Sequence, residues 1–87
     1  MAVVHLPPSL VNLFPGAPRQ LQIEAASVDE LLYRLDERWP GMRQRLCDAG
    51  PRIRAHINVF VDGERVPLAA PLQASSVVQI IPAVSGG

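Results

Sequence analysis

The sequence contains no lysine. All eight of its basic residues are arginine, and they balance eight aspartates and glutamates to a formal net charge of zero. Because binding to phosphate backbones or anionic membranes needs a basic excess, this balance argues against nucleic acid or a membrane as a partner. A genome rich in G and C disfavours lysine codons, which is the ordinary cause of such a composition.

Other absences narrow the class of protein. The single cysteine, Cys47, excludes an internal disulfide and a cysteine-ligated metal cluster, and we interpret it as a half-buried structural residue rather than a nucleophile. His5 and His56 lack the spacing of metal ligands, so no metal site is expected. No apolar run approaches the roughly 20 residues of a membrane span and no signal peptide opens the sequence, so we expect a cytoplasmic location.

The chain also offers no recognisable catalytic site. A glycine-rich phosphate loop with a lysine is missing, so ATP is not bound in that way. The carboxylates of the expected helix are interpreted as a solvated face rather than an acid/base pair; they are Asp29, Glu30, Asp36 and Glu37. These absences favour a carrier or interaction role over an enzyme, with no catalytic residue and no bound cofactor.

What the sequence does contain is one small domain with a well-marked helix. Its 87 residues are 48% apolar, which supports a folded globule with one modest core. A helix is predicted over 28–39. Ser27 and Glu30 form a capping box, in which the Ser27 hydroxyl accepts from the Glu30 N–H and the Glu30 carboxylate returns to the Ser27 N–H. Pro40-Gly41 ends the helix, and a further helical turn is expected over 42–47.

Strands are expected on both sides of this helix. The alternation and the β-branched runs predict them over 2–6, 20–24, 55–61, 64–67 and 77–81, with loops over 9–18 and 68–76. Asp62-Gly63 is a strong hairpin signal between two of them. The first and last strands are the most apolar, so we expect both in the middle of one mixed sheet with the helix on one face.

The other face of so small a sheet would stay open to water or to partners. Alternation along the strands places on it Val3, His5, Asn58, Phe60, Gln79 and Ile81. Val3, Phe60 and Ile81 would then form an apolar patch of the kind that often marks a protein-binding surface, the alternative being an ordinary scatter of surface apolar residues. Phe14, in the loop over 9–18, either covers the core or forms a further exposed contact.

The last residues form a distinctive ending. Pro82 cannot donate to a sheet ladder, so the final strand should stop there. The five residues over 83–87 could reach roughly 16 Å when extended, which makes them a flexible tail that follows a domain over 1–82. Gly86 and Gly87 make the tip thin, and its one reactive group is the terminal carboxylate. The alternative is a frayed end without a role.

Three stretches together resemble the MoaD/ThiS family of ubiquitin-like sulfur carriers. They are the ending over 80–87, Ile-Ile-Pro-Ala-Val-Ser-Gly-Gly, the stretch over 57–66, Ile-Asn-Val-Phe-Val-Asp-Gly-Glu-Arg-Val, and the helix that ends in Pro40-Gly41. The resemblance covers nearly the whole chain. It implies an α+β fold of the β-grasp type, a mixed sheet of four to five strands with one main helix on one face. One departure is Ala74-Ser75-Ser76, where many members carry an acidic turn of the Gly-Asp type.

The resemblance also implies a mechanism. A ubiquitin-activating-type partner would consume ATP to adenylate the Gly87 carboxylate, and a sulfide or persulfide would then displace AMP to leave a thiocarboxylate. Val84, Ser85 and Gly86 would thread the partner's active site, while Phe60, Ile81, Val3 and Phe14 would help to dock partner enzymes. In this setting the absence of lysine has a functional reading, because no lysine amine could capture the activated carboxylate within the chain.

The family leaves the sulfur acceptor and the role itself open. The ending and the proline-rich loop look closest to carriers that feed cysteine synthesis through a pyridoxal-phosphate-dependent sulfhydrylase. Molybdopterin, thiamine, thiolated tRNA and sulfur-containing natural products are other destinations. A protein modifier conjugated through Gly87, and a β-grasp interaction module with an inert end, are the competing roles. The free chain is expected to be a monomer.

Overall fold

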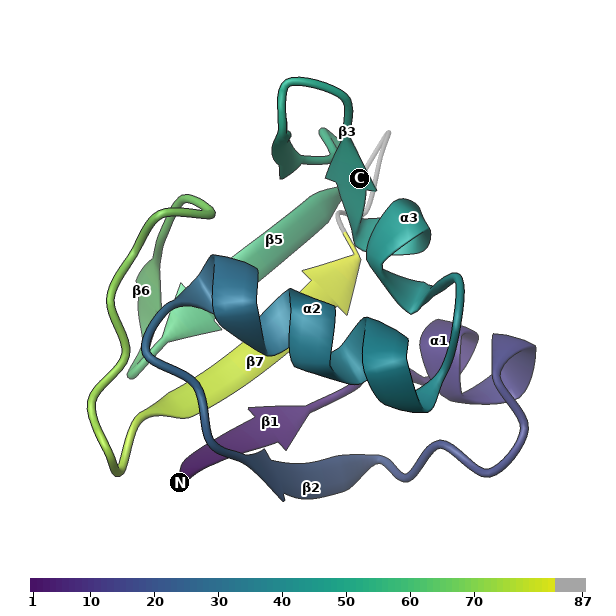
Figure 1. The fold of residues 1–87 in the computed structure, drawn as a ribbon, viewed down its shortest axis with the longest axis horizontal. Coiled ribbons are helices and arrows are strands. Elements are labelled where there is room, and N and C mark those ends of the chain that lie inside the picture. Colours follow the sequence, from purple (N-terminus) through teal and green to yellow (C-terminus); the bar gives the residue numbers. More distant parts are fainter. Residues whose placement is uncertain (83–87) are drawn as a thin grey trace.

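The structure, a computed structural model, describes residues 1–82. Along this part of the chain the elements are β1 (Ala2–His5), α1 (Pro8–Leu13), β2 (Gln20–Ile23), α2 (Val28–Arg38), α3 (Met42–Leu46), β3 (Cys47–Asp48), β4 (Arg52–Ile53), β5 (Ile57–Val61), β6 (Glu64–Arg65) and β7 (Val77–Pro82). Figure 1 shows α2 lying across the sheet, with the β3–β4 hairpin at one end of the molecule. No helix in this described part is long and apolar enough to cross a membrane.

Five strands form one mixed sheet in the order β2-β1-β7-β5-β6. β1 pairs antiparallel with β2 and parallel with β7, and β7 pairs antiparallel with β5. The first and last strands therefore lie side by side inside the sheet, as predicted. A mixed sheet with one long helix packed on one face is the β-grasp arrangement, so the expected fold class is confirmed.

The core lies between α2 and the sheet. The apolar positions of the helix and of the central strands are buried; they are Val4, Val28, Leu31, Leu32, Leu35, Val59, Val78 and Ile80. Met42 and Leu46 of α3 are also fully buried, as the predicted helical turn required. Because every central strand contributes alternate residues to this core, the register of the sheet is fixed by burial.

The N-terminus of α2 is capped nearly as expected. The Ser27 Oγ accepts from the Glu30 N–H at 3.1 Å. The Glu30 carboxylate returns to the Ala26 N–H at 2.8 Å, so the prediction that it binds the Ser27 N–H is wrong by one residue. Ser27 instead forms a β-bridge with Pro71, which draws its backbone toward the loop before β7.

The β5–β6 hairpin turns at Asp62-Gly63, as predicted. Both residues have positive φ, 51° and 88°, which is the conformation of a type I′ turn and suits aspartate followed by glycine. The turn is also tied to the last strand, because Asp62 Oδ1 accepts from the Val77 N–H at 2.9 Å and the Val77 carbonyl accepts from the Asp62 N–H at 2.9 Å. The start of β7 is thereby fixed to the hairpin.

The loop predicted over 9–18 is wrong in its first half, which forms α1. Pro7 is the N-cap and Pro8 occupies the first turn, where the missing N–H costs no helical hydrogen bond. Leu10 is buried in the core, and its carbonyl accepts from the Phe14 N–H at 3.0 Å. The prolines therefore start a short helix rather than preventing one.

The β3–β4 hairpin was not expected. Its two-residue strands pair Cys47 with Ile53 and Asp48 with Arg52 around the Gly50-Pro51 turn. The neighbouring predicted strands are shorter than the sequence pattern indicated, since β5 begins at Ile57 and β6 ends at Arg65.

Candidate functional site

The last strand ends at a position that β5 holds. β7 lies between β1 and β5, and its final residue, Pro82, pairs with Ile57 at the start of β5. β1 pairs with β7 only over residues 77–79, so the last three residues of β7 are held by β5 alone. The residues predicted to carry sulfur or thread a partner lie outside the described residues; they are Val84, Ser85, Gly86 and Gly87.

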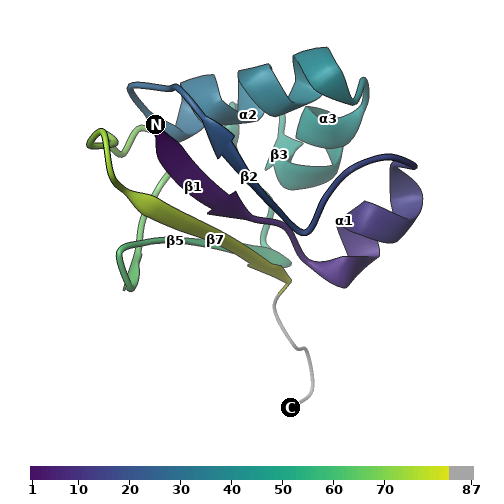
Figure 2. The same ribbon diagram turned by 90° about the horizontal axis from the view of Figure 1, so that it is seen from below.

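The sheet face opposite α2 is not covered by any element of residues 1–82. Figure 2 shows α2 and α3 on one side of β1 and β7, with no described helix on the other side. The strand register places the predicted residues on this uncovered face: Ile81 pairs with Asn58, and Gln79 pairs with both His5 and Phe60. We call this surface the open face.

The open face contains a discontinuous apolar patch. Ile81 is 42% exposed, and Val3 and Phe60 are partly exposed. The register brings Val77, 36% exposed, opposite Val3, which adds an apolar residue that the sequence interpretation did not include. The two-residue spacing from Gln79 could have identified it.

Polar residues run between the apolar ones. The register aligns one row across the whole sheet, formed by Gln20, His5, Gln79, Phe60 and Arg65. Phe60 therefore has a glutamine on one side and an arginine on the other. Such a mixed surface remains compatible with water when it is free and provides both apolar contact and hydrogen-bond groups to a protein partner.

Phe14, the fourth residue predicted to dock partners, does not share this face. It follows α1 and packs against the core, partly exposed, and its ring would lie 3.6 Å from a Cβ placed on Gly41. Phe14 thus lies beside the turn between α2 and α3. The structure places Val3, Phe60 and Ile81 on one face, at separate points of it, and leaves Phe14 apart.

Two carboxylates of α2 have structural partners, contrary to their interpretation as a solvated face. Asp29 Oδ1 accepts from Arg43 Nη2 at 2.7 Å, and the Arg43 guanidinium lies 4.0 Å from the centre of the Tyr33 ring. The hydrogen bond to Asp29 raises the pKa of Arg43. Asp36 Oδ1 accepts from the backbone N–H groups of Gly41 and Arg43. These contacts attach α3 to α2.

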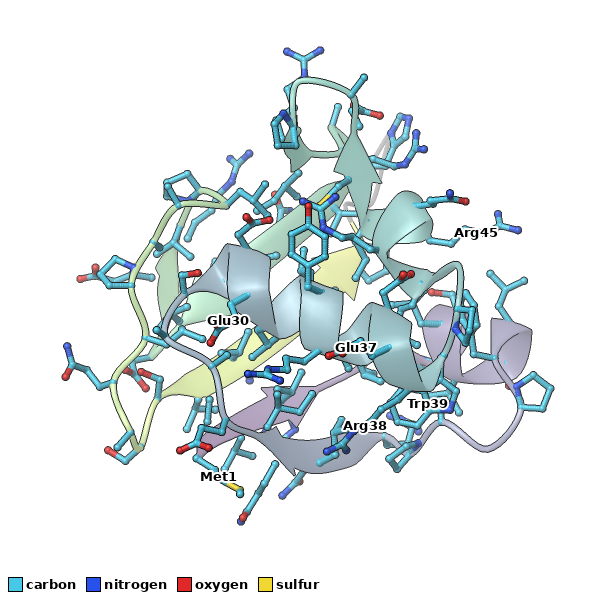
Figure 3. All side chains as sticks on the ribbon, viewed as in Figure 1. Met1, Glu30, Glu37, Arg38, Trp39 and Arg45 are labelled. Atoms are coloured by element: carbon cyan, nitrogen blue, oxygen red, sulfur yellow. The ribbon has the colours of Figure 1, made fainter. Side chains whose placement is uncertain are left out.

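Glu30 and Glu37 occupy exposed parts of α2 in different ways (Figure 3). Glu30 serves the cap described above, and Glu37 lies 3.9 Å from Arg34 in a solvent-exposed pair. Because exposed pairs contribute little, this interaction has a minor effect on stability. The four helix carboxylates thus divide between the cap, the contact with α3 and solvent, and none is paired with another carboxylate in the part of the chain described.

Cys47 is placed as a structural residue. It is 6% exposed, more buried than expected, at the junction of α3 and β3. Burial raises the pKa of its thiol, although the nearby Arg43 acts in the opposite direction. A protonated, buried thiol is a poor nucleophile. Within residues 1–82 no group of three or more histidines, cysteines or carboxylates is arranged to hold a metal ion.

Comparison with known proteins identifies the relatives of this chain. The family model described as the ThiS family matches residues 13–87. A chain of the crystal structure of the Amycolatopsis orientalis BexX/CysO complex is 27% identical, with a TM-score of 0.89 and 100% of each chain covered. Among curated protein sequences no match was found.

Two further solved structures have the same fold. The crystal structure of Mycobacterium tuberculosis CysO, described as an antigen, gives a TM-score of 0.87 at 22% identity, covering 97% of this chain and 100% of that one. The crystal structure of SAMP1 from Haloferax volcanii gives 0.80 at 25% identity, covering 99% and 98%. The fold of this chain is thus shared along nearly its whole length with proteins of similar size.

Proposed function

Because this chain belongs to the ThiS family, we propose that it is a sulfur carrier whose Gly87 carboxylate is activated by a separate ATP-dependent enzyme and converted to a thiocarboxylate. The chain itself supplies no catalytic group. It supplies the carboxylate, the residues that deliver it and the surface that docks the enzymes.

The proposed chemistry has two steps at Gly87. First, a carboxylate oxygen attacks the α-phosphorus of ATP, pyrophosphate leaves, and an acyl adenylate forms. Second, hydrosulfide attacks the acyl carbon and expels AMP, which leaves the thiocarboxylate. A protein persulfide can replace hydrosulfide if a second thiol then cleaves the resulting sulfur–sulfur bond. Activation is needed because a carboxylate is a poor acylating agent, whereas AMP is a good leaving group.

The position of Pro82 is the observation that best supports this proposal. β7 is the central strand, and Pro82 pairs with Ile57, so the residues that follow begin where β5 holds the end of β7. Five residues can reach roughly 16 Å beyond it, far enough to enter a partner's active site. Gly86 and Gly87 have no Cβ and would fit a narrow channel that excludes larger residues.

The open face is the proposed docking surface for both partner enzymes. Val3, Phe60 and Ile81 lie on it, at or near the strands that lead to Pro82. One surface next to the tail would engage the activating enzyme and the sulfur acceptor in turn. A docking role for Phe14 stays a prediction, and it would require a contact separate from the open face.

Cysteine synthesis is the destination we favour, with a pyridoxal-phosphate-dependent sulfhydrylase as acceptor. The similarity to the CysO chain at 27% identity supports this choice. Molybdopterin, thiamine, tRNA thiolation and natural-product sulfur are the other destinations, and each would use the same thiocarboxylate. An ATP-consuming partner would place the activation step in the cytoplasm.

A protein modifier is the second candidate function. The similarity to Haloferax volcanii SAMP1, a small archaeal modifier protein, favours it. In that role the activated Gly87 would form an amide with a lysine of a target protein instead of reacting with sulfur. Conjugates of higher mass on a denaturing gel, lost when Gly87 is deleted, would identify it.

The activation step can be tested with ATP–pyrophosphate exchange by the adenylating enzyme of the same organism. We expect deletion of Gly87 to abolish exchange while circular dichroism shows an unchanged fold, because the deleted residue lies beyond the last strand. Substitution of Cys47 by alanine is the matched control and should leave exchange intact. Undiminished exchange after Gly87 deletion would refute the proposal.

A further inference from the structure

A cavity of about 720 Å³ lies at the β5–β6 edge of the sheet, on the side that faces α2. We call it the edge groove. It is bounded by residues 51–55, by β5 and by residues 65–69. Its apolar lining includes Ile53, Ile57, Val59, Val66, Pro67 and Leu68. The open face lies on the opposite side of the same strands, so the two surfaces are separate.

The floor of the edge groove follows the repeat of a β-strand. Ile57 and Val59 are two residues apart on β5 and point to the same side, with a separation of about 7 Å. Val59 is fully buried, while Ile57 and Val66 are partly buried and pack against the core. A peptide in extended conformation repeats its side chains with the same spacing, so alternate apolar residues could contact this floor.

The rim of the edge groove is basic, although the whole chain is neutral. Three arginines contribute to the lining, Arg52, Arg54 and Arg65. The one lining carboxylate, Asp29, is already bound to Arg43 at 2.7 Å. The rim therefore has an excess of positive charge.

The three arginines differ in how far they are already paired. Arg54 Nη1 lies 2.9 Å from Asp48 Oδ1, and its Nε donates to the Gln44 carbonyl. Arg52 is 79% exposed and reaches Asp48 only at 4.0 Å. Arg65 is exposed and forms no ion pair with any described residue. The strand register pairs Arg65 with Phe60 and so places it on the open face, which leaves Arg52 as the cation available to a ligand in the edge groove.

We propose that the edge groove binds an extended segment of a partner protein in which apolar and acidic side chains alternate. The apolar side chains contact the partly exposed Ile57 and Val66, and a carboxylate pairs with Arg52. A guanidinium binds a carboxylate through two parallel hydrogen bonds, so the charge also fixes the register of the segment.

The position of the edge groove suggests which partner carries this segment. Ile57 lines the groove and pairs with Pro82, so the groove begins at the end of the sheet where Pro82 lies. A protein that contacts the chain beyond Pro82 can reach the groove at the same time. The identity of that protein rests on the proposed function, whereas the groove's preference for acidic and apolar residues does not.

A single-stranded nucleic acid fits the edge groove less well. Arginines would attract its phosphates, but the lining contains no aromatic side chain on which a base could stack. A second copy of this chain would have to present the exposed carboxylates of α2, which is a helix and not an extended segment. We therefore do not propose nucleic acid or a second copy of the chain as the ligand, and the test below would detect either one.

The test uses the full chain and an acetylated octapeptide of alternating glutamate and valine. Binding is followed through amide chemical shifts in heteronuclear NMR spectra. We expect shifts at Ile57, Val66 and Ala69, and weaker binding at higher salt because exposed charges are screened. Two control peptides, one alternating lysine and valine and one alternating glutamate and serine, should each bind at least about fivefold more weakly, because each loses one of the two interactions.

Single substitutions distinguish binding in the edge groove from a general attraction due to the net charge of the protein. Arg52→Glu should weaken binding about fivefold or more, whereas Arg45→Glu, with the same change in net charge, should change it less than about twofold. Figure 3 shows Arg45 projecting from α3, on the side of the molecule away from β6. Ala69 is exposed in the groove, so Ala69→Glu should weaken binding and Ala69→Arg should strengthen it.

Several results would overturn the proposal. Shifts confined to Val3, Phe60 and Ile81 would mean that the open face binds the peptide. Equal losses of peptide affinity for Arg52→Glu and Arg45→Glu would show that Arg52 has no specific role in binding. Tighter binding of an oligothymidylate, or concentration-dependent shifts at the groove without peptide, would assign the groove to nucleic acid or to self-association. Deletion of Gly87 should leave peptide binding unchanged, which separates a failure of the groove from a failure of the carrier function.

Discussion

The two faces of the sheet use the same strands for different purposes. On the face that α2 covers, Val59 and Ile80 are almost completely buried. On the open face, their sequence neighbours Phe60 and Ile81 remain partly exposed. Because side chains alternate along a strand, one residue step separates a position that stabilises the fold from one that is available for recognition. Substitutions at adjacent residues can therefore test the division directly.

The largest expected effect compares Ile80→Ala with Ile81→Ala. Ile80 is 2% exposed and packs in the core, so its truncation should lower the free energy of unfolding by about 3 kcal/mol. Ile81 is 42% exposed, and its truncation should cost about 0.5 kcal/mol or less. Urea denaturation measures both. Similar losses for the two variants would show that the faces are not divided as described.

The next effect concerns recognition rather than stability. Phe60→Ala should weaken binding to the activating enzyme about tenfold, since aromatic residues often dominate protein interfaces. Isothermal titration calorimetry gives the affinity, and urea denaturation should show a loss of less than about 1 kcal/mol because Phe60 is on the open face. A large loss of stability with unchanged affinity would place Phe60 in the core instead.

A smaller effect is expected where α3 is attached on the covered side. Arg43→Ala removes the hydrogen bond to Asp29 and the contact with Tyr33, and should lower the free energy of unfolding by about 1 kcal/mol. Arg45→Ala is the matched control, because Arg45 is exposed on the same helix and forms no ion pair with a described residue. Equal stability of the two variants would contradict a structural role for Arg43.

The smallest predicted effect is a change of the free energy of unfolding with pH that comes from the Cys47 thiol. Burial raises the pKa of this thiol above its ordinary value of 9.0, so the folded state retains the proton that the unfolded state loses. Its contribution to stability is complete below about pH 9 and is lost as the pH rises through the raised pKa. Unfolding measured from pH 8 to pH 10 should show a shallow decline. Cys47→Ala should remove this part of the decline, and an identical pH dependence in that variant would contradict it.

The parts of the fold predicted from sequence are those with local signals. The capped helix that begins after Ser27, the Asp62-Gly63 turn and the alternation along β5 depend on neighbours in the chain, and the structure confirms each. The open face followed from the same alternation, since one buried face implies an opposite one.

The features that sequence interpretation missed depend on distant contacts or on very short elements. The strands of the β3–β4 hairpin have two residues each, too few for a periodic pattern. α1 begins at a pair of prolines, Pro7 and Pro8, which usually signal a loop. The bond from Arg43 to Asp29 joins residues fourteen positions apart, and the edge groove is assembled from four separate segments. None of these leaves a local signal in the sequence.

The intact mass of the protein purified from its native host tests the carrier function most directly. We predict a fraction of the protein with a mass increase equal to sulfur replacing one oxygen, and fragmentation should assign this change to Gly87. Substitution of Cys47 by alanine should leave the fraction unchanged, which excludes modification of the only thiol side chain. An unmodified mass under all growth conditions, or only lysine conjugates of higher mass, would contradict the account.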